Sequence, residues 1–268
     1  MSKKILLTGA TDGIGLETAK RLVSEGHNVV VHGRSATKLA SLRELLGAMS
    51  GGKTIDSFEA DLSRMSDVFR LSDAILSKYD HIDVLINNAG VFKVTDPLTV
   101  DGLDVRFAVN TIAPYLLTKR LRTVLPRDGR VINVSSAAQA PVNTAALVGK
   151  PELEDYAAYA QSKLALTMWT RHLVKSTGQE GPMIVSVNPG SLLATKMVKE
   201  GFGMEGADVQ IGVDILYRAA LSDEFTSASG MFYDNDSKQF APPHPDALDP
   251  QKNAEVVRQI EHFLATFK

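Results

Sequence analysis

Cysteine is missing from the sequence altogether. This absence excludes disulfides, thiolate metal sites, iron–sulfur clusters and cysteine nucleophiles. Six histidines are present, but none shows the short spacing of metal ligands. Long hydrophobic runs are missing too. The apolar run near the start comprises only Ile5 to Leu7, which is too short for a signal peptide or a membrane span. We therefore expect a cytoplasmic protein with no membrane partner.

The chain also has almost no net charge. Lysine and arginine number 29 against 31 aspartates and glutamates, which leaves −2 at pH 7. Because a nucleic-acid-binding protein usually carries a strong basic excess, no nucleic-acid partner is expected. The 268 residues, of which 44% are apolar, suit a globular protein with a large buried core and one or two domains.

Short apolar runs alternate with segments of helical periodicity along the chain. The expected strands lie at residues 5–7, 28–32, 54–59, 82–86, 130–134, 183–187 and 230–233. The expected helices lie at residues 14–25, 38–46, 67–79, 103–125, 156–176, 209–221 and 251–267, with residues 241–250 as a surface loop. The strands are continuously apolar, as burial on both faces demands. This order predicts an α/β fold with a doubly wound parallel sheet of about seven strands and helices on both faces.

A glycine-rich loop follows the first expected strand. It reads Thr8-Gly-Ala-Thr-Asp-Gly-Ile-Gly15, and it places backbone amides and a helix N-terminus where a phosphate can bind. The spacing G-x-x-x-G-x-G differs from the G-x-G-x-x-G fingerprint, so the loop alone also fits a tight turn without a ligand. The candidate contacts are Gly9, Thr11, Asp12, Gly13, Ile14 and Gly15.

Tyr159 and Lys163 lie four residues apart in an expected helix and therefore share one face. A free tyrosine, with a pKa near ~10, is a poor acid or base at neutral pH. A nearby ammonium lowers that pKa, which favours Tyr159 as a general acid/base. Tyr156 is the competing tyrosine, but Ala160 stands four residues after it, so it lacks the cation.

Three motifs in order resemble those of the short-chain dehydrogenase/reductase family. They are Thr8-Gly-x-x-x-Gly-Ile-Gly15, Asn87-Asn-Ala-Gly90 and Tyr159-x-x-x-Lys163. The resemblance covers essentially the whole chain. It implies a Rossmann-type fold, a nicotinamide dinucleotide cofactor, and an oxidoreductase that interconverts a small-molecule carbonyl and alcohol. It also implies assembly into a homo-oligomer through the long helices. Because the motif residues extend from Thr8 to Gly190, we expect one domain over residues 1–268.

The resemblance implies roles for further residues. Ser136 would hydrogen-bond the substrate oxygen, with Ser135 structural, and Lys163 would also hold the nicotinamide ribose. Asn110 would join the catalytic set through a water linked to Lys163, and its apolar neighbours argue against an ordinary solvated position. Asn87 and Asn88 also fit turn positions. The remaining implied cofactor contacts are Asp61, Leu62, Asn88, Ala89, Gly90, Pro189, Gly190 and Thr195, the last one residue later than is usual in the family.

The residues after the second strand bear on the choice of nicotinamide cofactor. An NAD site places a carboxylate there to accept a hydrogen bond from the ribose 2′-hydroxyl. Here the strand ends His32-Gly33-Arg34-Ser35, with no acid. Arg34 can hold a 2′-phosphate through charge-assisted hydrogen bonds, and Ser35 and Lys38 can add donors. We predict NADP(H) rather than NAD(H); the alternative is that Arg34 is a solvated surface charge.

Two features point to a branch of the family. The segment between Ser136 and Tyr159 is long, and the run from Asp101 to Asn110 is similar to that of the retinol-dehydrogenase-like and WW-domain-oxidoreductase-like branch. Ala113 and Pro114 replace the glycine and histidine that are frequent in that branch. The branch's architecture is therefore expected here, but its retinoid activity is not.

Residues 191–210 combine apolar and small side chains. They are predicted to form a mobile lid, which favours a hydrophobic substrate, although simple core packing fits the same pattern. A rival hypothesis for the whole chain is a catalytically silent NADP(H)-binding regulatory protein. The presence of Asn110, Ser136, Tyr159 and Lys163 disfavours that rival, since a pure sensor does not need all four.

Overall fold

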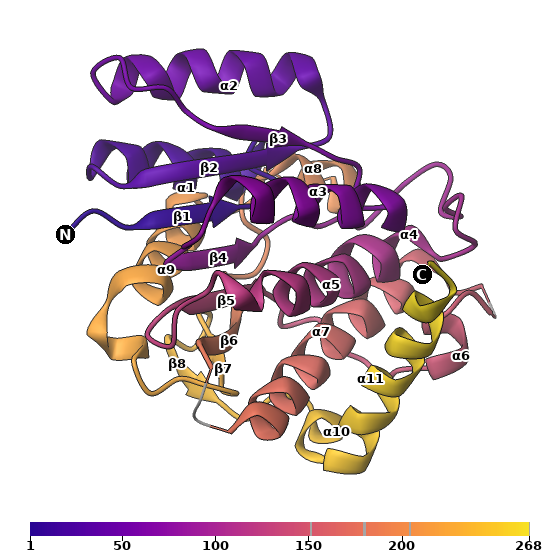
Figure 1. The fold of residues 1–268 in the computed structure, drawn as a ribbon. Coiled ribbons are helices and arrows are strands. Elements are labelled where there is room, and N and C mark those ends of the chain that lie inside the picture. Colours follow the sequence, from indigo (N-terminus) through magenta and orange to yellow (C-terminus); the bar gives the residue numbers. More distant parts are fainter. Residues whose placement is uncertain (151, 179–180, 204, 268) are drawn as a thin grey trace.

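An eight-stranded sheet forms the centre of the computed structural model, which describes residues 1–150, 152–178, 181–203 and 205–267 (Figure 1). The strands are β1 (Lys4–Leu7), β2 (Asn28–Gly33), β3 (Ser57–Glu59), β4 (Val84–Asn87), β5 (Arg130–Val134), β6 (Met183–Asn188), β7 (Phe232–Asp234) and β8 (Gln239–Ala241). Their order is β3-β2-β1-β4-β5-β6-β7-β8. The first seven pair in parallel, and β8 pairs with β7 in the antiparallel direction. The predicted doubly wound α/β fold is confirmed, with β8 as an additional edge strand.

The core lies on both faces of this sheet. Side chains alternate between the faces of a strand. Leu6, opposite Leu85 on β4, therefore enters one core cluster, whereas Ile5 and Leu7 enter the other. All three β1 side chains are at most 1% exposed. This double burial explains why the strand sequences are continuously apolar.

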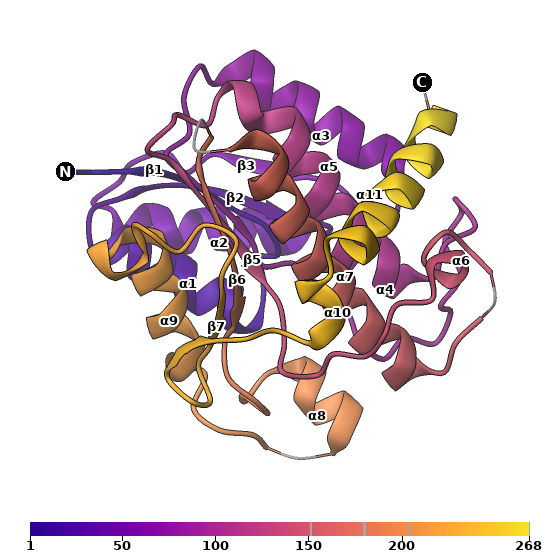
Figure 2. The same cartoon turned by 90° about the horizontal axis from the view of Figure 1, so that it is seen from below.

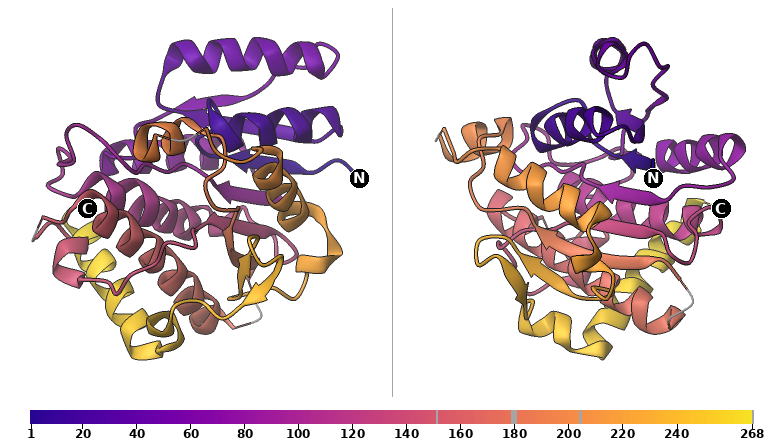
Figure 3. Two further views of the ribbon diagram at one scale, coloured as in Figure 1. Left: turned by 180° about the vertical axis from the view of Figure 1, so that it is seen from behind. Right: turned by 90° about the vertical axis from the view of Figure 1, so that its left-hand side faces the viewer.

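Two helical layers enclose the sheet, and Figure 2 shows them on its opposite sides. One layer consists of α1 (Gly13–Ser24), α2 (Ala36–Met49) and α9 (Gln210–Leu221). The other consists of α3 (Met65–Lys78), α5 (Ala113–Arg120) and α7 (Asp155–Thr177), with α11 (Pro250–Leu264) packed along the outside of α7 (Figure 3). The shorter helices are α4 (Val105–Phe107), α6 (Thr144–Leu147), α8 (Lys196–Phe202) and α10 (Pro245–Leu248).

The expected helix over residues 103–125 is interrupted. α4 runs into a π-helical turn, Ala108–Ile112, before α5 begins, and a 3-10 turn, Leu121–Thr123, follows. Pro114 stands in the first turn of α5, where a missing N–H is tolerated. A single π turn inside a helix often marks a functional site, and Asn110 lies at its centre.

The segment expected as a surface loop, residues 241–250, is also partly helical. α10 begins after His244, whose ring accepts a hydrogen bond from the Asp246 N–H, and Pro245 occupies its first position. Asp249 then caps α11. The loop prediction was wrong because these prolines mark helix starts. Among the described helices, none combines the length and the apolar character needed to cross a bilayer.

The buried position of Leu6 gives a first prediction. Leu6 is 1% exposed, so Leu6→Ala leaves a cavity and should lower the free energy of unfolding by about 2–5 kcal/mol. Urea denaturation measures this change. Leu45→Ala serves as the matched control because Leu45 is 42% exposed, and it should change stability by about 0.5 kcal/mol or less. Equal effects of the two substitutions would contradict the assigned core.

Candidate active site

The loops after β1 and β4 are joined at the carboxyl edge of the sheet, where ligands bind in open α/β folds. The Thr8 hydroxyl accepts hydrogen bonds from the N–H groups of Asn88 (3.0 Å) and Ala89 (3.1 Å). In return, the Asn88 amide donates to the carbonyls of Thr8 (2.9 Å) and Gly9 (3.1 Å). Asn88 and Ala89 therefore hold the glycine loop directly.

Glycine is required where this loop meets helix α1. Gly9 has φ +65°, and a Cβ at Gly15 would lie 2.3 Å from the Gly9 carbonyl oxygen and 2.5 Å from Nδ2 of Asn88. The loop consequently folds tightly onto the N-terminus of a helix of 12 residues. Its first-turn amides and the helix dipole form a cradle that fits a pyrophosphate.

Asp12, expected as a cofactor contact, caps α1 in the structure. Its carboxylate accepts a hydrogen bond from the Gly13 N–H at 2.9 Å and pairs with Nζ of Lys38 at 3.1 Å. Burial alone would raise the pKa of Asp12, but the hydrogen bonds from Lys38 and Gly13 outweigh it and lower the pKa. Lys38, predicted to add a donor near Arg34, is therefore shared with the glycine loop.

The carboxyl end of β2 carries the residues expected to select the cofactor. Arg34 is exposed, and Ser35 caps α2 through a 3.4 Å hydrogen bond from the Lys38 N–H. No carboxylate occurs in residues 32–35. The N-terminus of α2, a helix of 14 residues, thus adds a positive dipole end beside the Arg34 guanidinium.

His32 was not singled out from the sequence, yet it connects two cofactor loops. The Gly9 N–H donates to Nδ1 of His32 (3.3 Å), and Nε2 of His32 donates to the Ala60 carbonyl (3.1 Å). A ring that accepts at one nitrogen and donates at the other is neutral. Burial lowers the pKa of His32 to about 4.

The next loop contains Asp61 and Leu62, two of the implied cofactor contacts. The Asp61 carboxylate accepts hydrogen bonds from the Ser63 N–H (3.0 Å) and hydroxyl (2.7 Å), and Asp61 remains partly exposed. The side chain of Leu62 is 5% exposed and lies in the core. Of this pair, Asp61 is therefore the one whose side chain faces outward.

The proton-transfer candidates converge where α7 passes the end of β5. The Ser136 hydroxyl lies close enough to the Tyr159 phenol to lower its pKa. One helical turn on, Lys163 is 3% exposed, its Nζ lies 5.7 Å from the Tyr159 ring centroid, and it donates to the Val134 carbonyl at 2.8 Å. Tyrosine, serine and lysine are thus brought together as the resemblance implied.

The pKa values of this group differ from the sequence expectation. Burial raises the pKa of the Tyr159 phenol, and the neighbouring Ser136 hydroxyl opposes that rise without cancelling it. Burial also lowers the pKa of Lys163 to about 8. We expected Lys163 to lower the pKa of Tyr159, but in the structure desolvation of the phenol is the larger effect.

Ser135 and Ser136 point to different places. The Ser135 hydroxyl is buried and contacts the Lys163 carbonyl (3.2 Å) and the Thr167 hydroxyl (2.9 Å). The Ser136 hydroxyl is partly exposed, next to Tyr159. Of the two serines, Ser136 is therefore positioned to reach a substrate.

Asn110 holds the loop after β4. Its Oδ1 accepts from the Val91 N–H (2.8 Å), and its Nδ2 donates to the Val91 carbonyl (2.9 Å) and to the Ser162 hydroxyl (3.0 Å). A Cβ added at Gly90 would lie 3.5 Å from both Oδ1 of Asn110 and Nζ of Lys163. Asn110 from the π turn and Lys163 from α7 therefore both border Gly90.

A buried amide network lies behind these residues and was missed in the sequence. Asn87, interpreted there as a turn residue, ends β4 and donates to Oδ1 of Asn133 (2.8 Å) and to the Thr118 hydroxyl (3.1 Å). Nδ2 of Asn133 donates to the Thr170 hydroxyl (2.8 Å). The network ties β4 and β5 to α5 and α7. Its signal in the sequence is an asparagine near the end of each of two adjacent apolar strands.

The turn after β6 carries the last expected cofactor contacts. The Asn235 amide donates to the Pro189 carbonyl at 2.9 Å, and the Asp236 carboxylate accepts from the Ser191 N–H at 2.8 Å. Gly190 has φ +121°, a conformation that favours glycine. These bonds fix the point where the segment of residues 191–210 leaves the sheet.

Thr195 caps α8 by accepting a hydrogen bond from the Val198 N–H at 3.3 Å. Its methyl carbon would lie 3.4 Å from a Cβ added at Gly13. Thr195 therefore packs over the glycine loop, although it stands one residue later in the sequence than the family pattern implies.

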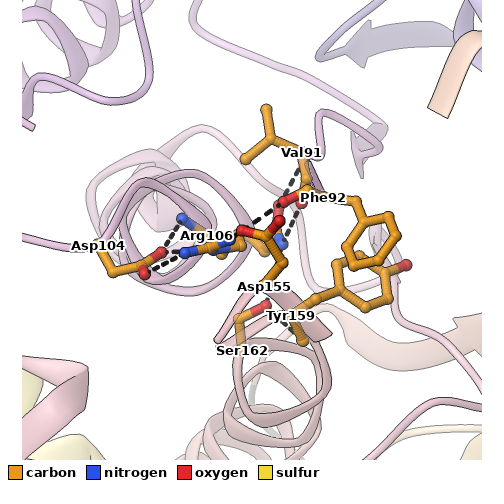
Figure 4. Close-up of polar contacts among 8 residues, drawn as sticks. Val91, Phe92, Asp104, Arg106, Asp155, Tyr159 and Ser162 are labelled. Carbon is orange, nitrogen blue, oxygen red and sulfur yellow. Dashed lines mark hydrogen bonds and ion pairs between the residues drawn. The ribbon is translucent and has the colours of Figure 1, made fainter. Parts of the chain in front are cut away.

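The ring of Phe92 lies between Tyr159 and α8. The rings of Phe92 and Tyr159 lie 5.0 Å apart at 60° (Figure 4). A Cβ added at Gly201 would lie 2.6 Å from the Phe92 ring, so α8 packs directly against Phe92. The phenol is thereby bordered by an apolar side chain as well as by Ser136.

The sequence model of a protein family, described as short chain dehydrogenase, matches residues 3–205. The chain belongs to the short-chain dehydrogenase family. The family predicted from the three motifs is therefore confirmed.

Relatives of this short-chain dehydrogenase include human retinol dehydrogenase 13, which is 26% identical over 284 residues, covering 96% of this chain and 82% of the relative. Human polyprenol dehydrogenase is 34% identical over 195 residues, 69% of this chain and 59% of the relative. The WW domain-containing oxidoreductase of Drosophila melanogaster is 30% identical over 249 residues, 86% of this chain and 61% of the relative. The match thus spans about three-fifths of the last two proteins. The predicted branch and enzyme class are confirmed.

Among solved structures, a short-chain dehydrogenase from Escherichia coli CFT073, crystallised with NADPH, is similar to this one with a TM-score of 0.70. It is 26% identical, and the match covers 87% of this chain and 96% of that chain.

His32 gives a prediction about acid stability. In the unfolded chain His32 takes up a proton near its ordinary pKa of 6.5, whereas burial lowers the pKa of His32 in the folded protein to about 4. Stability that depends on neutral His32 is therefore present above pH 6.5 and is lost as the pH falls toward 4, by about 3 kcal/mol. His32→Gln should lack this part of the loss. Urea denaturation between pH 7 and pH 4 compares the two proteins, and identical slopes would refute the assignment.

Proposed function

We propose that this short-chain dehydrogenase interconverts a carbonyl and an alcohol on a hydrophobic small molecule, using NADP(H), with Tyr159 as general acid/base. The observation that carries the proposal is the convergence of Ser136, Tyr159 and buried Lys163 at the carboxyl edge of the sheet. When bound, the nicotinamide cofactor supplies or accepts the hydride. The protein's own residues then have only to orient the substrate oxygen and to move one proton.

Ser136 and Tyr159 have different roles at the substrate oxygen. In reduction, the Ser136 hydroxyl hydrogen-bonds the oxygen as negative charge develops on it, and Tyr159 donates its phenolic proton. In oxidation, the same phenol oxygen receives the proton. A phenol whose pKa is raised by burial holds its proton firmly until an anionic oxygen forms beside it, which suits the acid role.

Lys163 and Asn110 support the phenol. The Lys163 ammonium, one turn after Tyr159, stabilises the phenolate that remains after proton donation. Its pKa of about 8 keeps it mainly protonated at neutral pH. Asn110 fixes the Val91 backbone and contacts Ser162 on α7, so it keeps the loop after β4 in place against the helix that bears Tyr159.

The glycine loop and the end of β2 support NADP(H) over NAD(H). The cradle at the start of α1 suits the pyrophosphate, and Arg34 beside the N-terminus of α2 suits a 2′-phosphate. Lys38 pairs with the Asp12 carboxylate and so offsets its negative charge. The similar E. coli structure holds NADPH, which agrees with this choice. The turn at Pro189 and Gly190, with Thr195, would hold the nicotinamide end.

The surroundings of Tyr159 favour an apolar substrate. Phe92 lies against the phenol ring and beneath α8, and residues 191–210 are proposed to act as a lid. Two relatives are named for retinol and polyprenol, both of which are long hydrophobic alcohols. We propose a substrate of that general character, with no specific retinoid activity. The homo-oligomer and the cytoplasmic location stay predictions.

A substrate screen tests the proposal. NADPH oxidation is followed over aldehydes, ketones and quinones, with NADP⁺ and alcohols in the reverse direction. We expect turnover of hydrophobic carbonyls. Tight NADPH binding with no turnover across the screen would instead support the rival hypothesis of a silent NADP(H)-binding regulator.

Tyr159→Phe tests the acid/base role. Removing the hydroxyl should lower kcat by about 10²- to 10⁴-fold, which is the usual contribution of general acid–base catalysis. Binding of NADPH, measured by fluorescence titration, should change little because the ring remains. Tyr156→Phe is the matched control, since Tyr156 is 58% exposed, and it should retain activity. Comparable activity in the two variants would rule out Tyr159 as the acid.

Arg34→Ala tests the cofactor assignment. Losing a charge-assisted hydrogen bond of about 1.5–3 kcal/mol should weaken NADPH binding by roughly 10- to 100-fold and leave NADH binding nearly unchanged. Arg70→Ala, an exposed arginine on α3 paired with Asp67, is the control. Equal losses for NADPH and NADH would show that Arg34 does not read the 2′-phosphate.

A further inference from the structure

Arg106 is a buried charge next to the site, with a side chain that is 1% exposed. Its guanidinium faces Asp104 with two nitrogens: Nε donates to Oδ1 at 2.8 Å and Nη2 donates to Oδ2 at 2.5 Å. The third nitrogen, Nη1, pairs with Asp155 and lies 3.5 Å from the Phe92 carbonyl oxygen. Figure 4 shows the guanidinium between these groups.

The partners of Arg106 come from three separate segments. Asp104 caps α4, Asp155 lies in the first turn of α7, and Phe92 belongs to the loop after β4. These are the segments that carry or hold the proton-transfer residues. Arg106 stands one helical turn before Asn110, and Asp155 stands one turn before Tyr159. The ion pair therefore joins the two helical segments just upstream of both residues.

Phe92 adds a second link to Tyr159. Its ring packs on the Tyr159 ring with centroids 5.0 Å apart, while its carbonyl faces Arg106. The preceding residue, Val91, has both of its backbone polar groups bonded by Asn110. A shift of the guanidinium would be passed to Tyr159 through α7 on one side and through Phe92 on the other.

Stability alone is a poor reason for a charge here. A buried ion pair is often replaced by apolar residues without loss of stability, because desolvation offsets the attraction between the charges. Its best-attested use is to specify one register of packing elements. The Arg106 cluster has the geometry for that use, since its bonds are directional and add a second polar link between elements that the Asn110–Ser162 hydrogen bond joins further along.

We propose that Arg106 is a positioning residue, which sets the register of α7 against the Asn110 turn and thereby holds the Tyr159 phenol beside Ser136 and Lys163. This role rests on the proposed function of Tyr159 as general acid/base. Arg106 itself touches neither the phenol nor the substrate; it acts through Asp155 and Phe92.

Two substitutions break the ion pair between Arg106 and Asp155, one at each partner. Arg106→Met keeps an apolar side chain of similar length in the core, and Asp155→Asn changes a partly exposed partner that is 40% accessible, so it should fold readily. A misplacement of about 1 Å can cost about 100-fold in rate. We therefore expect kcat to fall by about 10- to 100-fold in Arg106→Met and by less in Asp155→Asn, with the NADPH dissociation constant changed by less than about threefold.

Coupling between the two ends provides an internal check. In the double variant, kcat should be no lower than in Arg106→Met alone, because the two side chains act as one unit. Arg218→Met is the matched control: Arg218 is paired with Glu224, and its side chain is 35% exposed. Its kcat should equal that of the wild type. Lowered unfolding temperatures with unchanged kcat in both Arg106→Met and Asp155→Asn would overturn the proposal and leave Arg106 a purely structural residue.

Titration of the phenol separates positioning from direct electrostatics without relying on turnover. Phenolate absorbance is measured for each variant against the same variant carrying Tyr159→Phe. Removing the cation in Arg106→Met and the anion in Asp155→Asn should shift the Tyr159 pKa in opposite directions if charge acts through space. Displacement of the phenol predicts shifts in the same direction, because both variants weaken its contact with Ser136. Opposite shifts, or none, would overturn the proposal. If the wild-type protein shows no turnover but the two variants shift the Tyr159 pKa in the same direction, the proposed function is refuted and the positioning role stands.

Discussion

The parallel pairing of β1, β4, β5 and β6 between two helical layers is the constraint on which the site depends. Strands buried on both faces admit few polar side chains, so polar residues gather where the strands end. All these strands end at the same edge. Thr8, Asn88, Ser136 and the Pro189 turn therefore meet there although they are far apart in the sequence.

The polar residues that do enter the core show how strictly this constraint applies. Asn87 and Asn133 stand at the ends of adjacent strands and are bonded to each other and to threonines of α5 and α7. A buried amide without partners is costly, and the two bonds to threonines that meet this need also fix α5 and α7. The same principle places Arg106 between two carboxylates. Buried polarity in this protein therefore serves to orient the helices that carry Asn110 and Tyr159.

The sequence predicted well the features that depend on local spacing. The glycine loop, the Tyr159–Lys163 pair and the alternation of strands and helices follow from residue type and periodicity, and the fold and family are confirmed. It did not reveal the π turn, because one extra residue in a helical turn leaves no periodic signal around Asn110. It also missed β8, whose three residues are too few for a pattern. Arg106 and His32 resemble ordinary polar residues until their distant partners, Asp155 and Ala60, are known.

The electrostatics were harder to predict than the geometry. Four-residue spacing indicated that Lys163 would act on the Tyr159 phenol, and the two groups do share a helix face. The spacing carried no information on how deeply both would be buried. Desolvation raises the pKa of the Tyr159 phenol and lowers that of the Lys163 ammonium, which moves the two values apart and favours the uncharged form of each group.

α7 is enclosed between the sheet and α11, and residues 162–170 are buried without a break. A helix with no solvent-facing stripe in this stretch cannot fray locally without opening the core on both of its sides. Amide exchange there is consequently expected to require the global unfolding event, whereas exposed segments exchange through local openings. Lys163 and the buried residues up to Thr170 are therefore expected to belong to the slowest-exchanging unit of the molecule. Variation in the middle of this helix is therefore expected to be excluded.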